Sequence, residues 1–385
     1  MFKILSRYSF LEFFLSITLV FFSLSHFVAL ALGMSLVLMF LIIVFSRKQS
    51  ISINRIKIFK FCSFFVVLNL LVSISTFFDN FYLNNYVKFF AIQIFFFMFL
   101  FLSTYCISEK NLDNSLKIYL YIQATIFFIQ LIIYILFNFY INFDELIRDE
   151  NANALYETKA LIDSFIPIRA TGLYAEPSFY SMFVLVPAAY FLSKGILNFA
   201  TILAILTSLI SLSIVSIICC SLMIMFFLIT NKRFFAAKVI MIVAIIILFP
   251  TIYSVYQLRV YEAVDYDAIA SRSVILKELY LRNNINDIIG SGFFWNSLKP
   301  IGETGMFSYH ITDSSTYIYL YYCSGIIGSI FFAILMLYIF SFNKKGFFYL
   351  LCILLFKFQI LIGFFWLAIY LIGFKSSKKQ EIVDN

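Results

Sequence analysis

The chain has 385 residues, of which 63% are hydrophobic and 12% are charged, and its net charge is +8. A soluble domain carries about 25% charged residues, so the composition excludes an ordinary soluble protein and indicates a chain that crosses a membrane many times. The two histidines and six cysteines form no cluster with metal-ligand spacing, and no phosphate-binding or dinucleotide-binding glycine motif is present.

The apolar runs predict an all-α polytopic membrane protein with about 12 transmembrane helices. Each crossing needs roughly 20 apolar residues, so the longest runs must hold two crossings. The run 196–230 is expected to turn near Ser211–Ser213, and the last run near Lys357. The predicted spans are Tyr8–Ser23, Phe27–Phe45, Phe61–Phe78, Val87–Ile107, Ile118–Phe139, Phe179–Ser193, two within Ile196–Thr230, Phe234–Tyr253, Thr316–Phe342 and two within Gly346–Phe374.

The charged residues predict the side of the membrane on which each loop lies. On the side of both termini we count 18 basic and five acidic residues, whereas the two long loops, about 140–178 and 254–315, together carry eight basic and 14 acidic residues. Because basic residues concentrate on the cytoplasmic side, we expect residues 1–385 to form one membrane domain with cytoplasmic termini and two long external loops. The positive net charge is then a topology signal, and no nucleic-acid partner is expected.

The first long loop ends in a motif that places two charges against an apolar span, Arg169-Ala-Thr-Gly172-Leu-Tyr-Ala-Glu176-Pro177-Ser178. Charge at a membrane boundary is costly unless it reaches the interface, is paired or binds a ligand. Pro177 suits the first turn of a helix, and Gly172 allows a turn or a close backbone approach. The motif therefore indicates either a binding site or a helix entry with an interfacial Arg–Glu pair.

The second long loop contains a predicted helix over 268–283. On it Arg272, Leu276 and Leu279 are expected to share one face by three-and-four spacing. An arginine on such a face points toward protein or lipid headgroups, so it either binds a ligand or extends to the interface. Two aspartates just before the helix, Asp265 and Asp267, match a metal motif of sugar-nucleotide transferases, a pattern that any acidic loop produces by chance.

The remainder of this loop supplies two further groups of candidate residues. Gly290 and Gly292 flank a serine in a flexible turn that allows close backbone approach. His310 is the only histidine of the external loops, and Asp313 follows it by three residues just before the span that starts at Thr316. His310 is therefore a candidate general base, or an inert surface histidine.

Taken in order, these motifs resemble the Wzy-type O-antigen polymerases, within the O-antigen polymerase and ligase superfamily of membrane glycosyltransferases. The resemblance lies in Arg169-x-x-Gly172-x-x-x-Glu176-Pro-Ser before a span, Arg272 on a loop helix, Gly290-Ser-Gly292, and His310 ahead of an Asp-Ser pair and a Gly-Ile-Ile-Gly span. Ligases of this superfamily tend to carry His-Asn at the last position. Ile311 follows His310 here, which favours a polymerase.

The resemblance implies a substrate, namely oligosaccharide repeat units carried on undecaprenyl diphosphate at the outer face of the bacterial inner membrane. Arg169 and Arg272 would bind the diphosphate with forked, permanently charged donors. His310 would be the base for the acceptor hydroxyl, with Asp313 and Glu176 as alternatives. No cofactor or metal is expected, the lipid bilayer is a partner, and a chain-length regulator is a further candidate partner.

Two other functions compete with the polymerase. A ligase would transfer the finished glycan to lipid A-core or another acceptor, and its residues barely differ. A non-enzymatic flippase for the same lipid-linked unit would keep cations within the helix bundle, whereas most charges here lie in loops.

Overall fold

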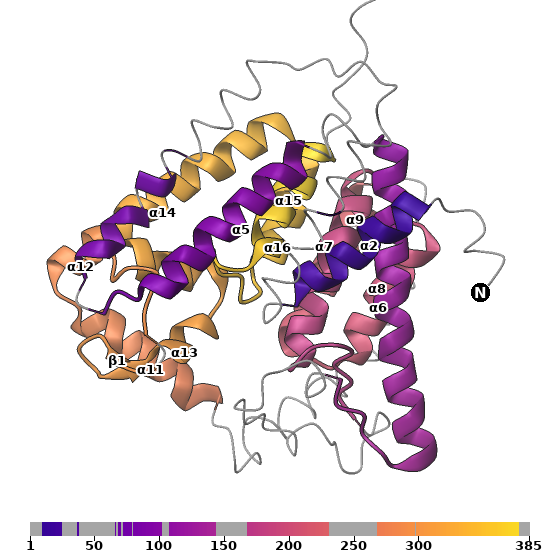
Figure 1. Cartoon of the computed structure of the whole chain (residues 1–385), viewed down its shortest axis with the longest axis horizontal. Coiled ribbons are helices and arrows are strands. Elements are labelled where there is room, and N and C mark those ends of the chain that lie inside the picture. The colour runs from indigo at the N-terminus through magenta and orange to yellow at the C-terminus, as the bar shows by residue number, and fades with distance from the viewer. Residues whose placement is uncertain are drawn as a thin grey trace, which may run out of the picture.

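The computed structural model describes residues 10–24, 37, 66, 68–70, 72–78, 80–101, 108–143, 168–230, 268–296 and 298–376. The described part is mostly helical, with one two-stranded hairpin (Figure 1). Its elements are α2 (Phe10–Ser23), the 3-10 helix η2 (Ile74–Phe77), α5 (Leu83–Phe101), α6 (Glu109–Phe137), α7 (Pro177–Ser193), α8 (Phe199–Ile210), α9 (Ile214–Thr230), α11 (Ala268–Leu281), α12 (Asn284–Ile289), β1 (Pro300–Ile301), β2 (Met306–Phe307), α13 (Ser308–Thr312), α14 (Thr316–Phe342), α15 (Lys344–Ile353), α16 (Gly363–Ala368) and the π-helical segment η6 (Ile369–Lys375).

Several predicted helix boundaries are confirmed. The run 196–230 divides into α8 and α9 around residues 211–213, α14 has the predicted bounds, and the last run divides into α15 and α16 on either side of Lys357. Two described helices, α6 and α14, are long and apolar enough to cross a membrane. The predicted span Phe234–Tyr253, nearly all of Phe27–Phe45 and much of Phe61–Phe78 lie outside the described residues, so the number of crossings stays a prediction.

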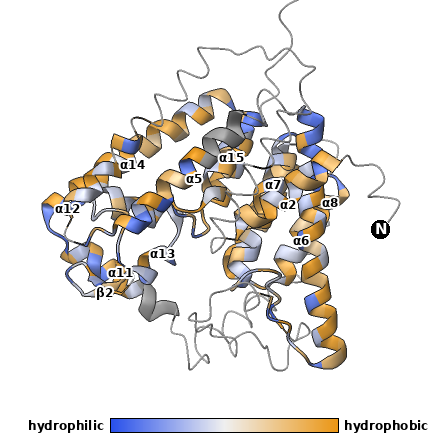
Figure 2. Cartoon of the chain, in the orientation of Figure 1, coloured by the Kyte–Doolittle hydropathy of each residue, from blue (hydrophilic) through white to orange (hydrophobic). Residues whose placement is uncertain are grey.

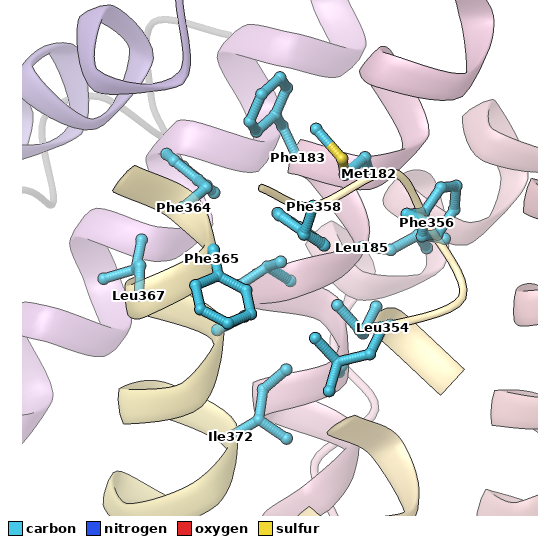
Figure 3. Packing of buried hydrophobic residues seen from close by; sticks show 14 of the residues in the cluster. Met182, Phe183, Leu185, Leu354, Phe356, Phe358, Phe364, Phe365, Leu367 and Ile372 are labelled. Carbon is cyan, nitrogen blue, oxygen red and sulfur yellow. The ribbon is translucent and has the colours of Figure 1, made fainter. Parts of the chain in front are cut away.

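Helix α7 is the centre of the hydrophobic core. Nearly every side chain from Tyr180 to Ser193 is buried, because α8, α9, α15, α16 and η6 all pack against this helix. Figure 3 shows Met182, Phe183 and Leu185 of α7 facing apolar side chains of the segment 354–372. A helix of this length spans about 25 Å, so its two ends lie on opposite sides of the core.

The outer faces of several helices are apolar. On α14, Ile326, Ile330, Ile334 and Leu337 are exposed at helical spacing, and α6 exposes Ile129, Ile132, Ile135 and Leu136 in the same way. Figure 2 shows this hydropathy along both helices. Soluble proteins rarely expose contiguous apolar surface on this scale, so these faces fit a lipid environment better than water.

The face of α11 that carries Leu276 and Leu279 is not its most buried face. Leu276 is exposed and Leu279 is partly buried, whereas Ile275 and Glu278 of α11 and Arg282 directly after it are buried. The backbone N–H groups of the turn between β1 and β2 donate hydrogen bonds to the Glu278 carboxylate. These bonds satisfy the buried charge and hold the face with Ile275 and Glu278 toward the protein interior.

Candidate functional site

The loop before α7 is fixed by a glutamine of α6. The Gln130 amide oxygen accepts hydrogen bonds from the backbone N–H groups of Thr171 and Gly172, at 2.8 and 2.9 Å. Gly172 has φ +58°, in the left-handed region that glycine adopts without strain. This turn sets the positions of Arg169 before it and Glu176 after it, and Arg169 is buried.

Glu176 lies at the start of α7, but its carboxylate does not cap the helix. Pro177 occupies the first turn, where its missing N–H costs no hydrogen bond. The carboxylate instead accepts hydrogen bonds from the Ser178 hydroxyl at 2.9 Å and from the Lys357 ammonium at 2.7 Å. The glutamate is therefore turned toward another part of the chain, a segment 181 residues away in sequence.

Lys357 joins two of the predicted catalytic residues. Its ammonium lies 2.7 Å from Glu176 Oε2 and 3.1 Å from Asp313 Oδ1, and 5.0 Å from the centre of the Phe179 ring. The lysine side chain is 17% exposed, whereas those of Glu176 and Asp313 are 44% and 35% exposed. The cation is thus held inside the protein while both carboxylates reach the surface. We call these three residues the charged cluster.

The electrostatics of the charged cluster favour the charged forms of Glu176 and Lys357. Burial acts to raise the pKa of Glu176, but the Lys357 ammonium, the Ser178 hydroxyl and Arg169 together outweigh burial and lower that pKa. Burial acts to lower the pKa of Lys357, and Glu176 and Asp313 outweigh it and raise that pKa. Arg169 therefore belongs to the electrostatic surroundings of Glu176, as the sequence motif suggested.

His310 and Asp313 are brought together by the short helix α13. Asp313 ends this helix and donates its backbone N–H to the Tyr309 carbonyl at 2.9 Å. His310 Nδ1 lies 3.1 Å from the Phe307 carbonyl oxygen, which can only accept, so Nδ1 carries the hydrogen. In the neutral imidazole, Nε2 is then an acceptor, as a general base requires.

The structure places Arg272 on α11, and its side chain lies outside the described part. Helix α11 packs against α13, the helix that carries His310 and ends at Asp313. The backbone of the second predicted diphosphate ligand thus belongs to an element adjoining the site.

Gly290 and Gly292 lie elsewhere, at a break in α14. Gly325 has φ 59° and ψ −156°, which interrupts the helix. The carbonyls of Tyr322 and Cys323 accept hydrogen bonds from the N–H groups of Ser291 and Gly292, at 2.9 and 3.0 Å. The turn around Ser291 thus supplies donors that the break would otherwise leave missing.

Close packing explains the glycines of this turn. A Cβ atom on Gly290 would lie 2.1 Å from the Cys323 carbonyl oxygen, and one on Gly325 would lie 2.5 Å from the Ile288 carbonyl oxygen. Gly290 and Gly292 also have φ values of +87° and +86°. Gly290 therefore allows this turn to lie close to the backbone of α14. In the described part of the chain, these glycines support the fold.

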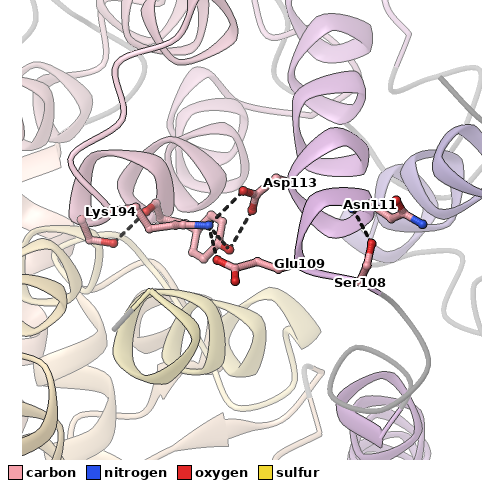
Figure 4. A network of polar contacts seen from close by, with 7 residues as sticks. Ser108, Glu109, Asn111, Asp113 and Lys194 are labelled. Carbon is pink, nitrogen blue, oxygen red and sulfur yellow. Dashed lines mark hydrogen bonds and ion pairs between the residues drawn. The ribbon is translucent and has the colours of Figure 1, made fainter. Parts of the chain in front are cut away.

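A second charged group lies at the other end of α7. The almost fully buried Lys194 ammonium lies 2.5 Å from Glu109 and 2.9 Å from Asp113, and the Tyr190 hydroxyl donates to Asp113 at 2.8 Å (Figure 4). Helices α6 and α7 are thereby joined at the end where the sequence predicts the cytoplasm. Both ends of the central helix thus carry ion pairs, and its middle is apolar.

Between these ends, one tyrosine gathers polar groups inside the bundle. The Tyr174 hydroxyl lies 2.6 Å from the Ser23 hydroxyl and accepts a hydrogen bond from the Gln123 amide at 2.7 Å. Tyr119 is a third neighbour, at 3.4 Å. This network connects α2, α6 and the loop of the site, two residues before Glu176.

Lys357 is the site residue that the sequence prediction missed. The apolar run that contains it indicated a turn at the surface, and a turn is present between α15 and α16. The usable signal was the charge itself, since a lysine near the middle of an apolar run needs a partner. The partners could not be identified, because Glu176 and Asp313 are far away in sequence.

Comparison with known proteins adds nothing to this geometry: no family model, no curated protein and no solved structure matches the chain.

Proposed function

We propose that the chain is a membrane glycosyltransferase that polymerises oligosaccharide repeat units carried on undecaprenyl diphosphate. The observation that carries the proposal is the charged cluster, in which Glu176 and Asp313 share the ammonium of Lys357 beside Arg169. These residues come from three separate segments and meet at one end of α7. The order of the sequence motifs, which resembles Wzy-type polymerases, supports the same function.

The surface of the fold supports a membrane location. The exposed apolar faces of α6 and α14 suit lipid chains, and the ion pairs at the two ends of α7 lie about 25 Å apart, close to the thickness of a hydrocarbon core. With the terminal segments in the cytoplasm, the charged cluster lies at the outer face of the bacterial inner membrane. That is the face on which lipid-linked repeat units are joined.

The charges suit the leaving group of this reaction. The acceptor hydroxyl oxygen forms a bond to the anomeric carbon of the donor glycan, and the bond from that carbon to the diphosphate breaks, leaving its electron pair on the diphosphate. Arg169 and Arg272 are the cations proposed to bind this group, whereas the charge of Lys357 is balanced by Glu176 and Asp313. Positive charge held in a partly buried site stabilises the departing anion.

The proton of the acceptor hydroxyl passes to a base. Glu176 is a weak base, because Lys357 and Arg169 hold its pKa below the ordinary value. His310 presents Nε2 as a hydrogen-bond acceptor, because Nδ1 donates to the Phe307 carbonyl. We therefore assign His310 as the base, with Glu176 and Asp313 orienting Lys357.

The experiment uses a strain that lacks the gene and carries plasmid copies of each variant. Arg169→Lys, Lys357→Met and His310→Ala should leave surface glycan with a single repeat unit when strains with equal protein abundance are compared. Arg169→Lys keeps the charge and loses the planar fork. Lys299→Ala is the matched control, because Lys299 is an exposed cation in the same predicted external loop as His310. This variant should give normal chain lengths.

Normal chain lengths in Arg169→Lys and Lys357→Met at normal abundance would contradict the proposed site. If the deletion strain attaches no repeat unit at all to its surface, the chain is a ligase or a flippase and not a polymerase.

A further inference from the structure

A row of three rings lies on the surface next to the charged cluster. The Phe307 and Tyr309 rings are nearly parallel, at an interplanar angle of 9° with centroids 6.2 Å apart, and His310 stacks on Tyr309 at 4.0 Å. Phe307 is 41% exposed and Tyr309 is 56% exposed. We call these three residues the aromatic platform. It ends three residues before Asp313.

The aromatic platform is held firmly from below. Met306 and Ile311, on either side of it in sequence, are buried. The β1–β2 turn is bound by Glu278 of α11, whose carboxylate accepts hydrogen bonds from the N–H groups of Glu303 and Thr304 at 3.0 and 2.8 Å. The rings are therefore exposed on a fixed support, and aromatic surface in a fixed orientation is what a preorganised binding site needs.

We propose that the aromatic platform binds a sugar ring of the acceptor glycan; this inference rests on the proposed function. The C–H face of a pyranose is apolar and slightly positive, and it matches the negative face of an aromatic ring, while the hydroxyl groups at the rim remain available for hydrogen bonds. The row of rings offers such a surface beside polar groups.

The position of the platform assigns it to the acceptor. A sugar that packs against the exposed rings of the platform lies in the same short row as His310, which has Nε2 free of the bond that Nδ1 makes to the Phe307 carbonyl. The Tyr309 carbonyl also accepts the backbone N–H of Asp313, which ties the platform to the charged cluster. The acceptor hydroxyl is thereby brought close to the base.

The test measures binding of saccharide to the purified protein in detergent micelles. The probe is the oligosaccharide fragment released by mild acid from the surface polysaccharide of the same cells. Saturation-transfer NMR detects its ring C–H protons when they lie against the protein. We expect a clear signal for the wild type, a similar one for Tyr309→Phe, and at least about a fivefold weaker apparent affinity for Tyr309→Ala.

Tyr280→Ala is the matched control, because Tyr280 is 88% exposed on the adjoining helix α11. It should keep the signal. Loss of folding is checked by the elution profile and by the thermal unfolding of each variant. Saccharide binding that is absent in the wild type, or unchanged in Tyr309→Ala, would overturn the inference.

The two proposals fail differently. Glu176→Gln should keep saccharide binding and lose polymerisation. Normal polymerisation by Tyr309→Ala would contradict the proposed sugar-binding role of the platform without contradicting the proposed glycosyltransferase function.

Discussion

Replacing Lys357 by methionine tests whether the charged cluster is an interacting unit. The change keeps the length of the side chain and removes the ammonium that lies 2.7 Å from Glu176 and 3.1 Å from Asp313. Exposed ion pairs contribute about 0–1 kcal/mol, and breaking a buried pair costs about 3–5 kcal/mol. Lys357 is 17% exposed while its partners are 44% and 35% exposed, so we expect a loss of about 1–3 kcal/mol in the free energy of unfolding.

A double-mutant cycle separates this interaction from general damage. Lys357→Met, Glu176→Gln and the double variant are unfolded in mixed micelles with increasing SDS, and the free energies are compared. Each single change removes the same contact between Lys357 and Glu176. The loss of unfolding free energy in the double variant should therefore be smaller than the sum of the two single losses, by about 1 kcal/mol or more. Effects that add to within about 0.5 kcal/mol would refute the reasoning.

The pH dependence of stability tests whether the Lys357 ammonium stabilises the ionised carboxylate of Glu176. Glu176 has a pKa below 4.5 in the folded wild type, so its contribution to stability is present above pH 4.5 and is lost as the pH falls through the lower folded value. In Lys357→Met, burial acts without its main counterweight and favours the protonated carboxyl. The stability gap between wild type and variant should therefore narrow as the pH falls from 7 toward 4.

Three further predictions concern the support of the site. Gly290→Ala should lower the free energy of unfolding by more than about 2 kcal/mol, because its Cβ would lie 2.1 Å from a carbonyl oxygen. Gly305→Ala, at a positive φ with open space around it, should lower it by about 1 kcal/mol. Equal losses in thermal unfolding would contradict this difference. Tyr174→Phe should lower the free energy of unfolding by about 1–3 kcal/mol, since it leaves Ser23 and Gln123 without a shared partner; an unchanged melting temperature would argue against the network. Lys194→Met should lower stability but keep normal glycan length per folded molecule, and short chains at normal abundance would show that the second ion-pair group serves the reaction.

The sequence predicted much of the fold where apolar length and helix-end chemistry decide the structure. Pro177 marked the start of α7, and the serines at 211–213 marked the turn between α8 and α9. The bounds of α14 were predicted, but its break at Gly325 was not. The break depends on donors supplied by Ser291 and Gly292, and those contacts are made only in the folded chain.

The candidate site could be predicted only in part. Local motifs pointed to Glu176 and Asp313, since carboxylates at the ends of apolar runs are conspicuous. Their common partner Lys357 could not be predicted, because nothing in the sequence specifies which distant loops meet. The buried face of α11 could not be predicted for a related reason, because a turn some 25 residues away in sequence binds Glu278.

Reconstitution of the purified protein in lipid vesicles with undecaprenyl-diphosphate-linked repeat units tests the central claim most directly. The account predicts lipid-linked glycans of two or more units, with one undecaprenyl diphosphate released for each new glycosidic bond, and no such products with His310→Ala. Transfer of intact single units across the bilayer, with no bond formed and no diphosphate released, would contradict it.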